Sequence, residues 1–198
     1  MEKSPVTLTD RIRSLTGRYV DGIGNAVHRA GIHPDLITLV GLVMVFVAAF
    51  FIASGRLQVG GLILLLGLPL DAVDGAVARA MHRQDKFGGV FDSTLDRYAD
   101  GLIFGALGYY FASQGQLDNL ALALAALLGS YAVSYVRARA AEAGLSVKVG
   151  IFTRMERVLV ILLTLMLPAL VVPGMWILAL GTNFTALQRV WFVYRKEM

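Results

Sequence analysis

The sequence contains no cysteine, which excludes a disulfide framework and any site built on a thiolate. Charge is also scarce, because only 16% of the 198 residues are charged while 57% are hydrophobic. A mean hydropathy of +0.66 is too high for a soluble domain and fits a polytopic membrane protein. The first 30 residues are polar and charged, which argues against a cleaved signal peptide. No motif for binding nucleic acid is visible.

Long apolar stretches predict an all-α membrane protein with six transmembrane helices. Pro34 and Asp35 suit the first turn of the first span, because Pro needs no backbone partner there and Asp complements the helix dipole. The dipeptide Pro173-Gly174 is expected to turn the chain between the fifth and sixth spans. We expect one domain over residues 1–198, in which residues 34–195 form the membrane bundle. The expected spans cover approximately residues 36–53, 57–81, 87–112, 120–136, 151–172 and 174–194.

An amphipathic helix is expected before the first span, over residues 7–31. Its apolar residues recur at steps of three and four, and the charged residues fall largely on the other face. This pattern is typical of a helix that lies in the membrane interface, which would make residues 1–33 an interfacial segment. A solvated helix packed on its neighbours would show the same pattern, and the sequence leaves both readings open.

The positive residues are distributed very unevenly. In the six-span topology, Arg56 is the only one of the 18 Lys and Arg residues that falls on the second side of the membrane. Positive residues mark the cytosolic side, so we expect both termini and any site near the other cations to face the cytosol of the cell membrane.

Four aspartates interrupt the second and third apolar stretches: Asp71, Asp74, Asp92 and Asp96. Each pair is three or four residues apart and therefore shares one helix face. An Asp near the centre of a membrane helix costs about 2.5–3.5 kcal/mol on insertion scales, so the set needs a cationic partner. Divalent cations supply that charge and prefer hard oxygen ligands, which suits phosphoryl transfer. Pore-lining or ion-paired buried acids are the alternative interpretation.

The spacing D-x2-D-G-x2-A-R-x8-G-x3-D-x3-D is matched at every fixed position between residues 71 and 96. In this the chain resembles the CDP-alcohol phosphotransferase family of integral membrane enzymes. The resemblance implies a homodimer and two divalent ions, Mg²⁺ or alternatively Mn²⁺, held by the four aspartates. It implies that Asp96 is the general base. It also implies a set of residues that bind a CDP-linked lipid: Pro34, Asp35, Thr38, Asp71, Gly75, Ala78, Arg79 and Gly88. Asp100 continues the same helix face outside the motif, and we expect a structural role for it.

The segments SYVRARAAEAGL (134–145) and GIFTRMERVL (150–159) resemble the subset of the family that makes phosphatidylinositol phosphate. In that subset a basic pocket binds the phosphate of the inositol phosphate acceptor, and Arg137 stands where a lysine is usual. Arg137 and Arg139 are two residues apart, so on a continuing helix only one of them faces the pocket. All five arginines could instead be ordinary positive-inside residues. The matching positions are Arg137, Arg139, Arg154, Arg157 and Arg189.

The resemblance therefore implies an enzyme that moves the phosphatidyl group of CDP-diacylglycerol, or its ether analogue, onto 1D-myo-inositol 3-phosphate and releases CMP. Glycerol 3-phosphate is the alternative acceptor, because it is also anionic. A divalent-cation transporter is a more distant alternative, since it would use the same acids but would not require the spacing of Gly75, Ala78, Arg79 and Gly88.

Overall fold

The computed structural model describes residues 21–81 and 86–197, apart from the side chains of six helical residues that include Asp71. Every regular element in this part of the chain is a helix. The elements are α2 (Pro34–Ala53), α3 (Leu57–Ala80), α4 (Lys86–Ser113), α5 (Leu117–Glu142), α6 (Arg154–Met166), a short 3₁₀ helix η1 (Pro168–Leu170) and α7 (Val171–Glu197).

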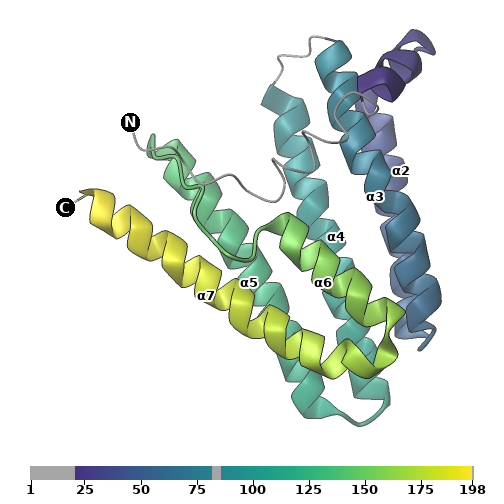
Figure 1. Cartoon of the computed structure of the whole chain (residues 1–198), viewed down its shortest axis with the longest axis vertical. Coiled ribbons are helices and arrows are strands. Elements are labelled where there is room, and N and C mark those ends of the chain that lie inside the picture. The colour runs from purple at the N-terminus through teal and green to yellow at the C-terminus, as the bar shows by residue number, and fades with distance from the viewer. Residues whose placement is uncertain (1–20, 82–85, 198) are drawn as a thin grey trace.

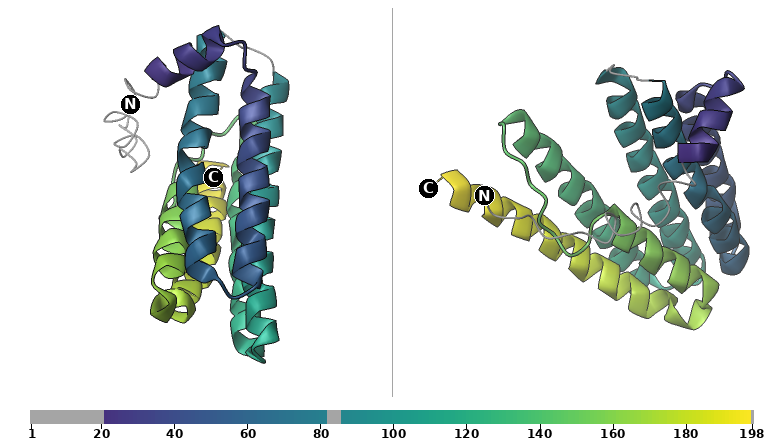
Figure 2. Two further views of the ribbon diagram at one scale, coloured as in Figure 1. Left: turned by 90° about the vertical axis from the view of Figure 1, so that its right-hand side faces the viewer. Right: turned by 45° about the horizontal axis from the view of Figure 1, so that its top comes forward.

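Helices α2, α3 and α4 form one group, and α5 and α7 form a second. The two groups meet at one end and diverge at the other (Figure 1). Helix α2 packs on α3 and α4, while α5 packs on both α4 and α7. Helix α6 lies between the groups, in contact with α3 and α7 (Figure 2). Helices α5 and α7 slant away from α2, α3 and α4.

The hydrophobic core lies at the end where the groups meet. It joins the end of α2 and start of α3 to the second half of α4, through residues such as Ile52, Leu57 and Phe104. From the other side, Leu165 of α6 and Met175 of α7 complete it. The opposite ends of the same helices carry almost all of the predicted site residues. Packing thus holds the bundle at one end and leaves polar side chains together at the other.

The boundary between the fifth and sixth predicted spans was misplaced. Pro173 and Gly174 do not turn the chain but lie in the first turn of α7, where proline is tolerated because its missing N–H would be unpaired anyway. The break comes earlier, at Leu167, and Pro168 begins η1. Helix α6 therefore has only 13 residues.

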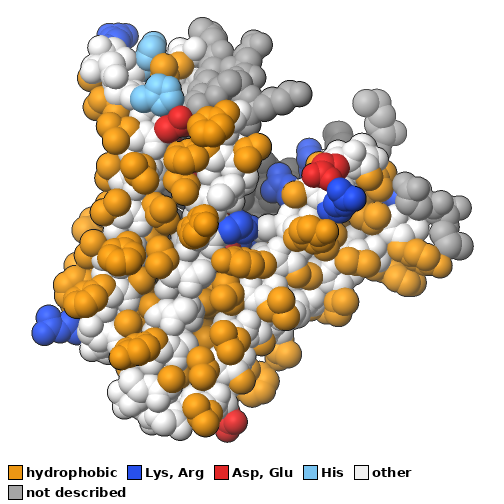
Figure 3. Space-filling view, turned by 180° about the vertical axis from the view of Figure 1, so that it is seen from behind, with side chains coloured by type: hydrophobic (Ala, Val, Ile, Leu, Met, Phe, Trp, Pro, Cys, Tyr) orange, Lys and Arg blue, Asp and Glu red, His pale blue; other side chains and the backbone are white. Residues whose placement is uncertain are grey.

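The outer surface is apolar, as expected for a membrane protein. Large side chains such as Phe46, Phe50 and Leu187 are more than 60% exposed on the outside of the bundle. The space-filling view shows hydrophobic side chains over both the upright body and the slanting arm, with cations in the hollow between them (Figure 3). Three described helices are long and apolar enough to cross a membrane: Pro34–Ala53, Leu117–Glu142 and the stretch Pro168–Lys196. The protein is a multi-pass membrane protein, and the described helices do not by themselves establish six crossings.

The structure does not describe residues 1–20, so more than half of the helix expected over residues 7–31 lies outside the described residues. Residues 21–29 are helical. The turn that follows this helix includes Gly31, whose φ of 73° only glycine adopts freely. This helix packs closely on α3 at Gly24, where an added Cβ would lie 2.6 Å from the Cβ of Ala76.

We expect Gly129→Ala to destabilise the contact between α5 and α7. A Cβ at Gly129 would lie 2.1 Å from Oγ1 of Thr182, which is fully buried, so the helices would have to move apart. Overpacking of this kind costs about 1–3 kcal/mol, which thermal unfolding in detergent would detect as a lower Tm. Gly105→Ala in α4 is the control, because an added Cβ there has open space. Equal Tm values for the two variants would contradict this packing.

Candidate functional site

A carboxylate cavity of about 200 Å³ lies between the start of α2, the end of α3 and the start of α4. Nine residues line it: Pro34, Asp35, Thr38, Asp74, Gly75, Ala78, Gly88, Gly89 and Asp92. Asp74 is 7% exposed, and its Oδ2 accepts a hydrogen bond of 2.8 Å from the Thr38 hydroxyl. Eight of these nine residues were predicted from the motif or from the start of α2, and Gly89 is the addition. Small residues on α3 and α4 leave room beside the acids.

The start of α2 is well suited to place its residues at this cavity. Pro34 occupies the first turn, and the Nδ1 of His33 accepts a hydrogen bond from the backbone N–H of Asp35. The Thr38 hydroxyl lies within hydrogen-bond distance of both the Pro34 carbonyl, at 3.1 Å, and Asp74. These local contacts fix Asp35 and Thr38 at the cavity.

A second, larger cavity of about 930 Å³ adjoins the first. It is lined by residues of α4, α5, α6 and α7, and its polar side chains include Asp92, Asp96, Arg97, Arg137, Arg154, Arg157 and Arg189. Because Asp92 lines both spaces, the acids of α4 stand between the carboxylate cavity and this arginine cavity. Four of the five predicted acceptor-binding arginines come together here.

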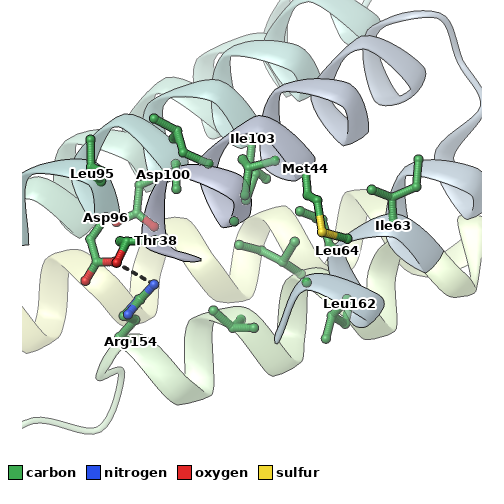
Figure 4. A pocket seen from close by; sticks show the side chains of 17 residues that line it. Thr38, Met44, Ile63, Leu64, Leu95, Asp96, Asp100, Ile103, Arg154 and Leu162 are labelled. Atoms are coloured by element: carbon green, nitrogen blue, oxygen red, sulfur yellow. Dashed lines mark ion pairs between the residues drawn. The ribbon is translucent and has the colours of Figure 1, made fainter. Parts of the chain in front are cut away.

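Two ion pairs join α4 to α6 beside the arginine cavity. Arg154 Nη2 lies 2.6 Å from Oδ1 of Asp96, as the close view shows (Figure 4). One turn further along both helices, Arg157 Nη2 donates to Oδ2 of Asp100 at 3.1 Å. The outer pair is partly open to solvent, since the Arg154 side chain is 40% exposed, whereas Arg157 is 2% exposed.

Arg189 is held by backbone carbonyls from two directions. Its Nε donates to the carbonyl of Val149 at 2.9 Å, and its Nη1 donates to the carbonyl of Val133 at 2.7 Å. Gly150 follows Val149 with a φ of 137°, where a Cβ would also lie only 2.6 Å from Cγ2 of Thr185. The connection between α5 and α6 can therefore approach α7 closely enough to orient Arg189.

Three predicted site residues are not placed with the others. Arg139 lies outside the arginine cavity and pairs with Glu142 on an exposed part of α5, as the two-residue offset from Arg137 allows. Arg79 pairs with Asp21 of the N-terminal helix at 2.9 Å and is not among the residues that line the carboxylate cavity. Asp71 lies on α3 one turn before Asp74, but its side chain is outside the described part of the structure.

Two residues at the site were missed by reasoning from the sequence. Arg97 was read only as a topological charge, yet it lines the arginine cavity 3.7 Å from Asp96. Tyr131 had no sequence signal, and its hydroxyl donates to the Arg97 carbonyl at 2.9 Å. At the start of α6, Glu156 accepts a hydrogen bond from the Thr153 hydroxyl.

The donor set suits a hard divalent cation. Asp74 and Asp92 present carboxylate oxygens to one cavity, and these are the ligands that Mg²⁺ and Mn²⁺ prefer. Among the described side chains alone, no group of three or more potential ligands is close enough to hold a metal. Asp71 is not part of that set, and Asp96 points toward Arg154 in this structure.

Comparison with known proteins agrees with the motif. A family model for CDP-alcohol phosphatidyltransferases matches residues 31–187. The archaetidylinositol phosphate synthase of Methanothermobacter thermautotrophicus is 35% identical over 195 residues, which cover 96% of each chain.

Two crystal structures of the phosphatidylinositol phosphate synthase of Mycobacterium tuberculosis have a similar fold at 29% identity. The form with CDP-DAG bound has a TM-score of 0.83 and covers 89% of this chain and 94% of the mycobacterial one. The complex with manganese and citrate has a TM-score of 0.80 and covers 88% of each chain. The aspartate motif, the all-helical membrane fold and the extent of the family match agree: the chain belongs to the CDP-alcohol phosphatidyltransferase family and is a membrane phosphotransferase.

Proposed function

We propose that this enzyme transfers the phosphatidyl group of CDP-diacylglycerol, or of its ether analogue, to 1D-myo-inositol 3-phosphate. The products are a phosphatidylinositol phosphate and CMP. The relatives named above are, by name, synthases of archaetidylinositol phosphate or of phosphatidylinositol phosphate. Membership of a transferase family also makes a divalent-cation transporter a poor description of the chain.

One observation carries the proposal: an acidic cavity and a cationic cavity meet at Asp92. A reaction between a metal-bound diphosphate and a phosphorylated acceptor needs these two environments side by side. The carboxylates favour a metal–nucleotide complex, while Arg137, Arg154, Arg157 and Arg189 favour an anionic acceptor. Serine or unphosphorylated inositol would not require so many arginines.

We assign the metal to Asp71, Asp74, Asp92 and Asp96, with two Mg²⁺ ions as the expected complement and Mn²⁺ as the alternative. Bound there, the cations would neutralise charge on the diphosphate and on the departing CMP. Thr38 orients Asp74 through its hydrogen bond, which is the usual task of a residue behind a metal ligand. Pro34, Asp35, Gly75, Ala78 and Gly88 are assigned to the nucleotide side, and Arg79 lies at its edge, paired with Asp21.

The acceptor is activated by the protein itself. Asp96 takes the proton from the attacking hydroxyl of the inositol ring. The oxygen of that hydroxyl then bonds to the lipid-side phosphorus of the diphosphate. The bond from that phosphorus to the bridging oxygen breaks, and the oxygen leaves as part of CMP. The arginines hold the acceptor phosphate away from the reacting centre and so fix which hydroxyl faces Asp96. Arg154, which contacts Asp96, is the arginine nearest to this proton transfer.

The same proposal includes the topology. We infer six membrane crossings with both termini and the two cavities on the cytosolic side, an N-terminal helix at the interface, and a homodimer. The acid-bearing α3 and α4, together with the short α6 and the residues that flank it, would supply the three crossings that length and hydropathy alone do not identify. The site lies at the diverging ends of the helices, on the side that the charge bias assigns to the cytosol.

The decisive experiment compares acceptors. Purified enzyme with CDP-diacylglycerol and Mg²⁺ should release CMP when 1D-myo-inositol 3-phosphate is added, and far more slowly with glycerol 3-phosphate, serine or free inositol. Release with glycerol 3-phosphate alone would keep the transferase reaction but replace the proposed acceptor. A reaction mixture without enzyme and one with EDTA are the controls.

A further inference from the structure

We propose that Asp100 is a positioning residue for the acceptor, because its carboxylate sets the orientation of Arg157 in the arginine cavity. This inference rests on the proposed function for the identity of the acceptor, but only on the geometry for the link between the two residues. Asp100 lies outside the aspartate motif and does not line the arginine cavity. Any effect that it has on the acceptor must therefore pass through another residue.

Asp100 lies one turn beyond Asp96 on the same face of α4, below the outer ion pair. It is 7% exposed and borders a small, mostly apolar pocket together with Leu95, Ile103 and Leu162 (Figure 4). A carboxylate in such surroundings requires a cation, and Arg157 at 3.1 Å supplies it. Arg97, at 4.0 Å, adds a second positive charge.

Arg157 is buried and yet lines the arginine cavity. Its Nη2 donates to Asp100, while its Nε finds no hydrogen-bond partner among the described residues. A guanidinium is a rigid planar fork, so fixing one arm fixes the direction of the others. The pair with Asp100 therefore sets the orientation of a buried guanidinium that also lines the cavity into which an anionic acceptor would enter.

Helix α4 accordingly carries three acids with separate tasks at steps of one turn. Asp92 borders both cavities, Asp96 meets Arg154 at the mouth, and Asp100 holds Arg157 below. Because both ion pairs join α4 to α6, the buried pair also keeps the arginines of α6 opposite the acids of α4. Loss of Asp100 should therefore weaken acceptor binding and leave the CDP-lipid site largely intact.

A double-mutant cycle tests this inference in the full-length enzyme with CDP-diacylglycerol. We expect Asp100→Asn to raise the KM for inositol phosphate by about tenfold, with roughly unchanged KM for the CDP-lipid. Arg157→Gln should raise the acceptor KM at least as much. If Asp100 acts through Arg157, the double variant should be no worse than Arg157→Gln, because the second change removes nothing further. Asp118→Asn, at an exposed position on α5, is the matched control and should behave as the wild type.

Asp100→Glu covers the case in which the Asn variant does not fold. It keeps the charge but lengthens the side chain, so it should displace Arg157 and raise the acceptor KM in a folded protein. Additive effects of Asp100→Asn and Arg157→Gln, or equal changes in the KM values of both substrates, would overturn the inference. If the wild type uses glycerol 3-phosphate rather than inositol phosphate, the proposed function fails. The same cycle measured with glycerol 3-phosphate would then still decide the role of Asp100.

Discussion

Asp96→Asn should reduce kcat for CMP release by roughly 10²–10⁴-fold, the usual contribution of a general base. The amide has almost the same shape as the carboxylate but cannot take the proton from the acceptor hydroxyl, and it is a poorer metal ligand. Of the proposed substitutions this one should have the largest effect, because Asp96 belongs to both parts of the site: it borders the arginine cavity and lies in the metal motif.

Stability should change little in the Asp96→Asn variant. The Arg154 side chain is 40% exposed, so water can solvate it when its partner loses the charge. Exposed ion pairs contribute only about 0–1 kcal/mol, and because the Asp96 side chain is 13% exposed we expect the loss to lie at the upper end of that range. The measurement is CMP release over time, alongside Tm and yield of the purified variant. Asp118→Asn removes the same charge at an exposed site and should keep full activity. Normal turnover by Asp96→Asn would remove Asp96 as the base.

Arg189→Ala should raise the KM for inositol phosphate by about tenfold or more, because hydrogen bonds to a charged group contribute roughly 1.5–3 kcal/mol. The KM for CDP-diacylglycerol should stay roughly constant, since Arg189 lines the arginine cavity and not the carboxylate cavity. Some loss of stability is also expected. The carbonyls of Val149 and Val133 both accept from this buried side chain and would lose their partner.

Two further variants separate acceptor binding from stability. Arg189→Lys keeps the positive charge but loses the planar fork, so we expect an intermediate acceptor KM. Arg139→Ala removes a cation that lies only two residues from Arg137 but outside the cavity, paired with Glu142. Its acceptor KM should equal that of the wild type. If Arg139→Ala and Arg189→Ala had the same effect, the arginines would act as general positive charge and not as a pocket.

Much of the carboxylate cavity could be predicted because helix periodicity fixes which residues share a face. Gly88 and Asp92 come from one helix, and the short connection before α4 brings Asp74 and Gly75 near them. The charge pattern likewise predicted a membrane protein with its cations near one end. The turn at Pro168 was missed because two prolines lie five residues apart, and only the packing of α7 decides which of them ends a helix.

What the sequence determined by itself was the family, the apolar character of the bundle and the acids of the motif, since each depends on local spacing. The tertiary structure alone decided which arginines line the arginine cavity and which lie outside it. Periodicity indicated that only one of Arg137 and Arg139 faces the pocket, but not which one. Side chains from α5, α6 and α7 meet over long sequence separations, so periodicity also could not show that Arg97 lines the cavity or that Asp100 pairs with Arg157. Contacts of that kind depend on how the helices cross, and the crossing is set by the core at the other end of the bundle.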